Sequence, residues 1–215
     1  MKIFPESSFF KERRAPALPT PAEIRAIKVS GTASFNRPLP VMIPLLGLVV
    51  KYGADVTIIE AQTQIVVREK LQGQVPIPKV FGWTKDEGQR FIYMSLIEGE
   101  ALQERWSDID NNERQAICEE LKHLVKAWRA LEQDKHDRYI GSLGKQSLND
   151  IFLARHLELA EPFQGINAVQ QFQDTCGIEI SSDVPIIFTH DDLVPPNILL
   201  SPGPNPKVAA VIDWG

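Results

Sequence analysis

Four polar residues toward the C-terminal end have the types and spacing that phosphoryl transfer requires. His190 and Asp192 are two residues apart, and Asn197 follows Asp192 by five residues. Asp213 comes after a proline-rich reversal between two short apolar runs, which predicts a hairpin that returns Asp213 to the others. In phosphoryl transfer one carboxylate orients the acceptor hydroxyl and takes its proton. An amide oxygen and a second carboxylate hold Mg²⁺ against the triphosphate.

Each of these residues also has an alternative interpretation. Asp191 competes with Asp192 as the proton acceptor, although the interval of five residues to Asn197 favours Asp192. For His190 a buried, hydrogen-bonded core histidine is favoured over a general base. Asn197 follows two prolines and would otherwise be a turn residue, and Asp213 would otherwise terminate a strand.

The elements that must position these residues begin with a β-rich run that ends in Val49-Val-Lys51-Tyr-Gly53. A helix is predicted from Glu60 to Gln72, with Gly73 as its terminator. The stretch 75–82 is predicted to be extended because each of its prolines disfavours helix in the preceding residue. Residues 91–97 predict a further strand. The order strand, helix, strand, strand predicts a small sheet that carries one helix.

After residue 99 the pattern becomes helical. Apolar residues from Ile117 to Leu131 share one helical face, and Asp110 with Glu113 predicts a capping box. A second helix is predicted over 149–161, before Pro162. Residues 198–200 and 208–212 are predicted to form the hairpin that carries Asp213.

In this region the sequence resembles the aminoglycoside phosphotransferase family of the protein-kinase-like superfamily. The resemblance rests on His190-x-Asp192, Asn197 and the later Ile212-Asp213-Trp214, and it covers roughly residues 45–215. It implies that Asp192 is the catalytic aspartate, that Asn197 and Asp213 bind Mg²⁺, and that His190 braces the catalytic loop.

The same resemblance implies roles for residues of the first strands. Lys51 would bind the α- and β-phosphates of ATP and pair with Glu60, and adenine would meet backbone groups near Met94 to Leu96. The implied fold is α+β and two-lobed. Residues 1–44 are expected to be an irregular segment, 45–97 a nucleotide-binding lobe with a sheet and one helix, and 98–215 a mostly helical, incomplete second lobe.

Two features depart from the family pattern. No GxGxxG precedes Lys51, and only Gly31-Thr-Ala-Ser34 is remotely suitable as a phosphate-covering loop. The chain also stops two residues after Asp213, and Gly215 stands where the family commonly has a glutamate. Family members continue with further helices, so a truncated second lobe is expected.

Composition sets the broader class. The chain has 215 residues, of which 43% are hydrophobic, and a net charge of −5, which disfavours nucleic-acid binding through a basic face. Its longest apolar run, 41–50, is interrupted by Pro44 and Gly47 and is too short to span a bilayer. Cys118 and Cys176 are expected to be reduced and partly buried. A cytoplasmic, soluble protein is expected.

Three hypotheses follow. The leading one is an ATP- and Mg²⁺-dependent transfer of the γ-phosphoryl group to a hydroxyl of a small molecule. The second is a non-catalytic relative that binds nucleotide without turnover, which the missing glycine loop favours and the complete set Lys51, Asp192, Asn197 and Asp213 disfavours. The third is a fragment that cannot fold alone.

Overall fold

A computed structural model describes residues 1–27, 34–71, 73–134, 136–148, 161–180 and 185–214. Its largest sheet is antiparallel and five-stranded, and the strand that carries Lys51 lies inside it. Helix α3 (Ile58–Leu71) connects the third strand to the fourth and packs on one face. In spatial order the strands are β1 (Lys2–Ile3), β4 (Val80–Asp86), β5 (Gln89–Ser95), β3 (Leu48–Gly53) and β2 (Val41–Ile43).

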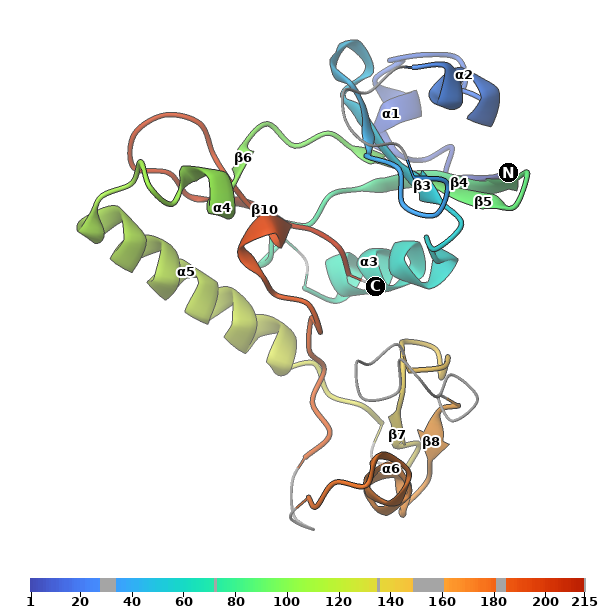
Figure 1. The fold of residues 1–215 in the computed structure, drawn as a ribbon, viewed down its shortest axis with the longest axis vertical. Helices are drawn as coiled ribbons and strands as arrows, with labels where there is room; N and C mark the ends of the chain where they lie inside the picture. Colours follow the sequence, from blue (N-terminus) through green and yellow to red (C-terminus); the bar gives the residue numbers. More distant parts are fainter. Residues whose placement is uncertain (28–33, 72, 135, 149–160, 181–184, 215) are drawn as a thin grey trace.

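The two faces of this sheet are both covered, which explains the nearly continuous apolar character of its central strands. Side chains alternate along a strand, so Phe91 and Tyr93 pack into one cluster while Ile92 and Met94 pack into another. The second cluster includes Ala61 of α3. The first lies on the opposite face, beneath α1 and α2, so the sheet forms the middle layer (Figure 1).

The first 44 residues contribute more to this lobe than the expected irregular segment would. They supply β1, which pairs with β4, β2, which pairs with β3, and two short helices. The helices are α1 (Ser8–Lys11) and α2 (Pro21–Ala26). Phe9 and Ile24 of these helices are fully buried against the sheet. A capping box starts α2: Thr20 and Glu23 bond reciprocally, and Pro21 occupies the first turn.

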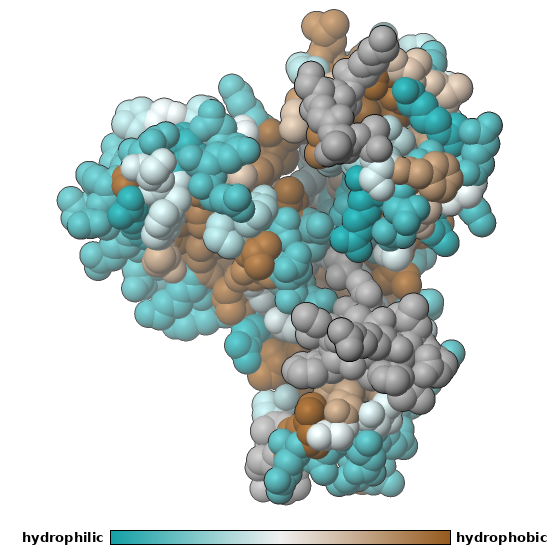
Figure 2. All heavy atoms as spheres, in the orientation of Figure 1, coloured by the Kyte–Doolittle hydropathy of each residue, from teal (hydrophilic) through white to brown (hydrophobic). Residues whose placement is uncertain are grey.

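The second part of the chain is organised around α5 (Asn111–Arg129). The predicted capping box is confirmed, since Asp110 Oδ1 accepts from the backbone N–H of Glu113 at 2.9 Å and Glu113 Oε2 accepts from that of Asp110 at 2.9 Å. The predicted apolar face is also confirmed, because Ile117, Leu124 and Trp128 are buried in a core shared with α3 and the C-terminal hairpin. Hydrophobic side chains gather where α5 faces the centre of the molecule, whereas its outer side is hydrophilic (Figure 2).

The hairpin predicted to carry Asp213 is present as two antiparallel strands, β9 (Ile198–Leu200) and β10 (Val208–Val211). Together with β6 (Glu100–Ala101) they form a three-stranded sheet. The remaining short elements frame this core or lie beyond α5. They are η1 (Pro44–Leu46), α4 (Leu102–Arg105), β7 (Tyr139–Ile140), β8 (Phe163–Gln164), α6 (Ala168–Cys176) and η3 (Pro195–Asn197).

The remaining expectations had different outcomes. The two-lobed, protein-kinase-like α+β fold is confirmed, with an antiparallel sheet and one helix followed by a part that contains α4, α5 and α6. This second part is less helical than expected, because fewer than half of its described residues lie in helices. Residues 75–79 have no regular structure, and β4 starts only at Val80. Cys118 is exposed, because it lies on the outer side of α5. The helix predicted over 149–161 lies almost wholly outside the described residues. Among the described residues, no helix is long and apolar enough to cross a membrane.

Candidate active site

The site begins with Lys51, which β-strand alternation turns toward α3. Leu48 and Val50 of β3 face the opposite cluster, so Val49 and Lys51 point to the helix. Lys51 Nζ lies 2.8 Å from Glu60 Oε2 and 2.5 Å from Asp213 Oδ1. One ammonium group thereby joins Glu60, nine residues further along the chain, to Asp213, which lies 162 residues from Lys51.

The local sequence explains why Glu60 is available to this ammonium. Thr57 Oγ1 accepts a hydrogen bond from the backbone N–H of Glu60, which satisfies a donor of the first turn of α3. Glu60 and Gln64 lie on the buried face of α3, and Gln64 Nε2 donates to the carbonyl of Pro78 at 2.9 Å. The predicted pairing of Lys51 with Glu60 is present in the structure.

Burial and charge act in opposite directions at this cluster. Burial lowers the pKa of Lys51, but the carboxylates of Glu60 and Asp213 outweigh it, so its pKa is raised and the ammonium is kept. Burial raises the pKa of Glu60, with a further contribution from Asp213 and an opposing one from Lys51. A cation shared by two carboxylates leaves the cluster negative, which suits the binding of a metal cation with the phosphates.

The segment 190–197 is held in place by its own side chains. Asn197 Nδ2 donates to the Asp192 carbonyl at 2.9 Å and to Asp192 Oδ2 at 3.1 Å. The backbone N–H of Asn197 donates to the Val194 carbonyl at 2.9 Å, within the turn of η3. These hydrogen bonds fix the orientation of the Asp192 carboxylate. The partner of that carboxylate is Asn197, the residue five positions later that the sequence pattern predicted.

Two further hydrogen bonds tie this loop to the end of β10. The Ile212 backbone N–H donates to the Asn197 carbonyl at 2.9 Å, and the His190 ring contacts the Ile212 carbonyl through Nε2 at 3.0 Å. Asp213 follows directly and has a left-handed backbone, with φ of 65°. That conformation is uncommon for residues other than glycine, and aspartate and asparagine tolerate it best. The hairpin thus brings Asp213 next to the loop, as its position in the sequence predicted.

His190 is a buried ring within an aromatic cluster. Its ring centroid is 4.5 Å from that of Trp214 and 6.2 Å from that of Trp128. A carbonyl only accepts, so Nε2 carries the proton that bonds Ile212. Burial lowers the pKa of His190 against the opposing effects of the Ile212 carbonyl, Asp213 and Asp192, which favours the neutral ring.

Trp214 is the residue of this site that the sequence interpretation left without a role. It is 2% exposed, and its ring packs edge-on against that of Trp128 and stacks on that of Phe188, with ring centroids 5.4 Å and 6.3 Å apart. Its Nε1 donates to the Val211 carbonyl at 2.9 Å. Trp214, the residue directly after Asp213, is therefore anchored in the core. In the sequence, the only indication of this role was a tryptophan next to an aspartate that ends a strand.

The segment proposed to meet adenine lies at the end of β5. Met94 is buried against α3, where Gln64 Nε2 approaches its sulfur at 3.5 Å. The backbone N–H of Leu96 donates to the Gly47 carbonyl at 2.9 Å. That N–H is therefore already engaged within the chain.

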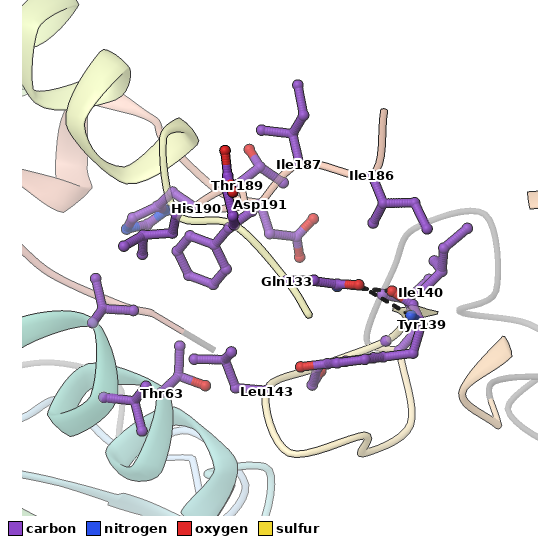
Figure 3. Close-up of a pocket in the computed structure, with 18 of the residues that line it drawn as sticks. Thr63, Gln133, Tyr139, Ile140, Leu143, Ile186, Ile187, Thr189, His190 and Asp191 are labelled. Atoms are coloured by element: carbon purple, nitrogen blue, oxygen red, sulfur yellow. Dashed lines mark hydrogen bonds between the residues drawn. The ribbon is translucent and has the colours of Figure 1, made fainter. Parts of the chain in front are cut away.

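A cavity of about 440 Å³ lies on the other side of α3 from the sheet, between this helix, the chain after α5 and residues 186–191. Figure 3 shows Thr63 of α3 facing it from one side and Ile187 and Asp191 from another. Gln133 closes one wall through two hydrogen bonds with the backbone of Tyr139, at 2.8 and 3.0 Å. The volume is in the range of small-molecule pockets.

The oxygen ligands predicted for Mg²⁺ fit that ion. Asn197 turns its amide nitrogen to Asp192, which leaves the amide oxygen as its potential metal ligand. Asp213 supplies a carboxylate, and Mg²⁺ is commonly held by one or two protein oxygens while phosphates and water fill its other positions. Within the part of the chain that the structure describes, no group of three or more His, Cys, Asp or Glu side chains is disposed to hold a metal.

The family model of the phosphotransferase enzyme family, APH, matches residues 57–215. This range includes α3 with Glu60, the loop 190–197 and Asp213. The chain belongs to the phosphotransferase enzyme family. The search of curated proteins found no match to this chain.

Solved structures that are similar to part of this chain include two of a thermostable mutant of the aminoglycoside phosphotransferase APH(4)-Ia. The apo form is 16% identical with a TM-score of 0.48, and a ternary complex with AMP-PNP and hygromycin B is 17% identical with a TM-score of 0.47. Each alignment covers 78% of the present chain. It covers 59% of the solved chain in the apo form and 58% in the ternary complex. The present chain thus spans about three fifths of the length of those proteins.

Proposed function

We propose that this phosphotransferase moves the γ-phosphoryl group of ATP to a hydroxyl group of a small molecule with the help of Mg²⁺. The observation that carries the proposal is the cluster in which Lys51 joins Glu60 at 2.8 Å and Asp213 at 2.5 Å. It places a cation, a buried carboxylate and a candidate metal ligand together beside the loop of Asp192. Family membership supports phosphoryl transfer as the reaction class.

Each residue then has a role that follows from its chemistry. Lys51 neutralises charge on the α- and β-phosphates and is oriented by Glu60. Asn197 and Asp213 would hold Mg²⁺, which when bound neutralises the triphosphate and orients the transferred group. Met94 and Leu96 lie in the segment proposed to contact adenine. His190, neutral and buried, braces the loop through the Ile212 carbonyl.

Asp192 is proposed to orient the acceptor hydroxyl and to receive its proton. Asn197 Nδ2 bonds both the Asp192 carbonyl and Oδ2, so the carboxylate is positioned before the substrate arrives. The bond from the acceptor oxygen to the γ-phosphorus forms as the bond from that phosphorus to the bridging oxygen of ADP breaks. The hydroxyl proton goes to Asp192.

The acceptor is proposed to be a small molecule with an alcohol group. Its hydroxyl must reach Asp192, which does not line the cavity beside His190 and Asp191, so that cavity is not assigned to the acceptor. For the nucleotide we propose the space between the sheet of residues 45–97 and the loop of the second lobe, residues 98–215. A cytoplasmic location, where ATP and Mg²⁺ are abundant, suits this reaction.

ADP release measured across a panel of small alcohols, amino alcohols and aminoglycosides tests the proposal. We expect release that depends on both Mg²⁺ and one class of acceptor, because Asp192 is proposed to orient the hydroxyl of the acceptor. Binding of Mg·ATP with no transfer to any acceptor would overturn the enzymatic proposal and favour a non-catalytic nucleotide-binding protein. The Lys51→Met variant is the background control, since it lacks the phosphate-binding cation.

A further inference from the structure

We propose that Arg14, in the N-terminal segment, is a positioning residue for the adenine-binding segment around Leu96. The inference rests on the proposed function, since it takes residues 94–98 as the place where the base binds. Arg14 and its contacts on η1 lie before residue 57, where the match to the family model begins. The contacts that Arg14 makes with Leu46 and Gly47 therefore lie outside the matched range, whereas Leu96 lies within it.

Arg14 contacts the turn that leads into β3. Its Nη1 donates to the carbonyls of Leu46 and Gly47, each at 3.3 Å. Glu12 holds the other side of the guanidinium, at 2.9 Å from Nε and 2.6 Å from Nη2. The guanidinium is thus fixed at both ends, which favours a defined geometry over a mobile surface side chain.

The Gly47 carbonyl is the link between Arg14 and the proposed base site. The same oxygen accepts the Leu96 N–H at 2.9 Å and the Arg14 guanidinium at 3.3 Å. Gly47 has φ of 55°, and a Cβ at this position would run into the Arg14 side chain. The left-handed turn favours glycine here, and any larger residue would displace the Arg14 guanidinium from its observed position.

The rest of the N-terminal segment is attached independently of Arg14. Phe9 is fully buried against the sheet, β1 pairs with β4, and Arg25 bonds Asp86 at 2.6 Å. Removing the Arg14 guanidinium should leave this segment docked and release only the turn 44–47. The Leu96 segment then becomes less ordered, and a base that binds there must supply the ordering free energy.

The experiment compares the wild type with Arg14→Ala and Arg14→Lys by calorimetric titration with three probes: Mg·ATP, adenosine and Mg·tripolyphosphate. For Arg14→Ala we expect the Kd of ATP and of adenosine to rise about fivefold to tenfold, where tenfold corresponds to about 1.4 kcal/mol. The Kd of tripolyphosphate should stay within about twofold, because the Lys51 ammonium is held by Glu60 of α3 and by Asp213 rather than by Arg14. Arg14→Lys should recover part of the loss. The control is Lys11→Ala, which removes an exposed ion pair with Glu6 from the same segment.

Hydrogen exchange supplies a readout that needs no ligand. The Leu96 amide should exchange faster in Arg14→Ala than in the wild type, while amides of α5 keep their protection. An unchanged Kd for ATP and adenosine in Arg14→Ala would overturn the inference, and so would an equal loss for tripolyphosphate. A wild-type chain that binds none of the three probes would instead overturn the proposed function, and the inference with it.

Discussion

Replacing Asp192 by alanine is expected to lower the rate of phosphoryl transfer by about 10²–10⁴-fold, the usual contribution of a positioned general base. The carboxylate that accepts the proton is removed, whereas Lys51, Glu60 and Asp213 keep their contacts. Mg·ATP should therefore still bind with an affinity close to that of the wild type. Single-turnover kinetics at saturating nucleotide measure the chemical step directly.

The neighbouring aspartate is the matched control for this variant. Asp191 has φ of 71°, and asparagine tolerates that conformation, so Asp191→Asn changes charge without adding backbone strain. We expect Asp191→Asn to keep most of the transfer rate, because the Asn197 side chain is bonded to Asp192. A loss in Asp191→Asn with an intact rate in Asp192→Ala would exchange the two roles.

Truncating Trp214 to alanine is expected to lower the free energy of unfolding by about 3–5 kcal/mol, the usual cost of removing a large buried aromatic side chain. The variant loses the contacts with Trp128, Phe188 and His190, together with the hydrogen bond from Nε1 to Val211. Denaturant unfolding monitored by circular dichroism measures the difference.

An exposed tryptophan of the same lobe is the control. Trp106 is 43% exposed and lies against the Arg114 guanidinium at 4.9 Å. Trp106→Ala should cost less than about 1 kcal/mol, in line with an exposed cation–π contact. Equal losses in Trp106→Ala and Trp214→Ala would show that the aromatic cluster around His190 does not hold the loop and the hairpin together.

The parts of the site that are predictable from sequence are those with local geometry. The interval from Asp192 to Asn197 is bridged by one loop, and the structure shows direct hydrogen bonds between these two residues. Lys51 and Glu60 are nine residues apart on a strand and the following helix, so a short connection brings them together. Asp213 lies 162 residues from Lys51, and its place was predictable only because a hairpin precedes it.

The N-terminal segment could not be predicted in the same way. Strand β1 has two residues and helix α1 has four, too few to show a period. Their conformation depends on tertiary contacts, such as the burial of Phe9 in the sheet. The hydrogen bond from the Leu96 N–H to the Gly47 carbonyl could not be predicted from the sequence either, since it depends on how the end of β5 meets the turn before β3. The candidate phosphate-covering loop, Gly31-Thr-Ala-Ser34, lies almost entirely outside the described residues.

We propose that Lys51, Glu60, Asn197 and Asp213 together form a site for Mg·ATP. Thermal unfolding with and without Mg·ATP, in the wild type and in Asp213→Asn, tests it most directly. Asparagine keeps the left-handed backbone at this position, so the variant removes charge from the site with little backbone strain. The exposed Asp108→Asn is the control for loss of a carboxylate elsewhere.

At nucleotide about 100 times above Kd, binding should stabilise the wild type by about 2.7 kcal/mol, which raises the melting temperature by several degrees. We expect this shift to require Mg²⁺, to persist in Asp108→Asn and to shrink in Asp213→Asn, each compared with its own nucleotide-free sample. A wild-type transition that ignores Mg·ATP, or an equal shift in Asp213→Asn, would contradict the site.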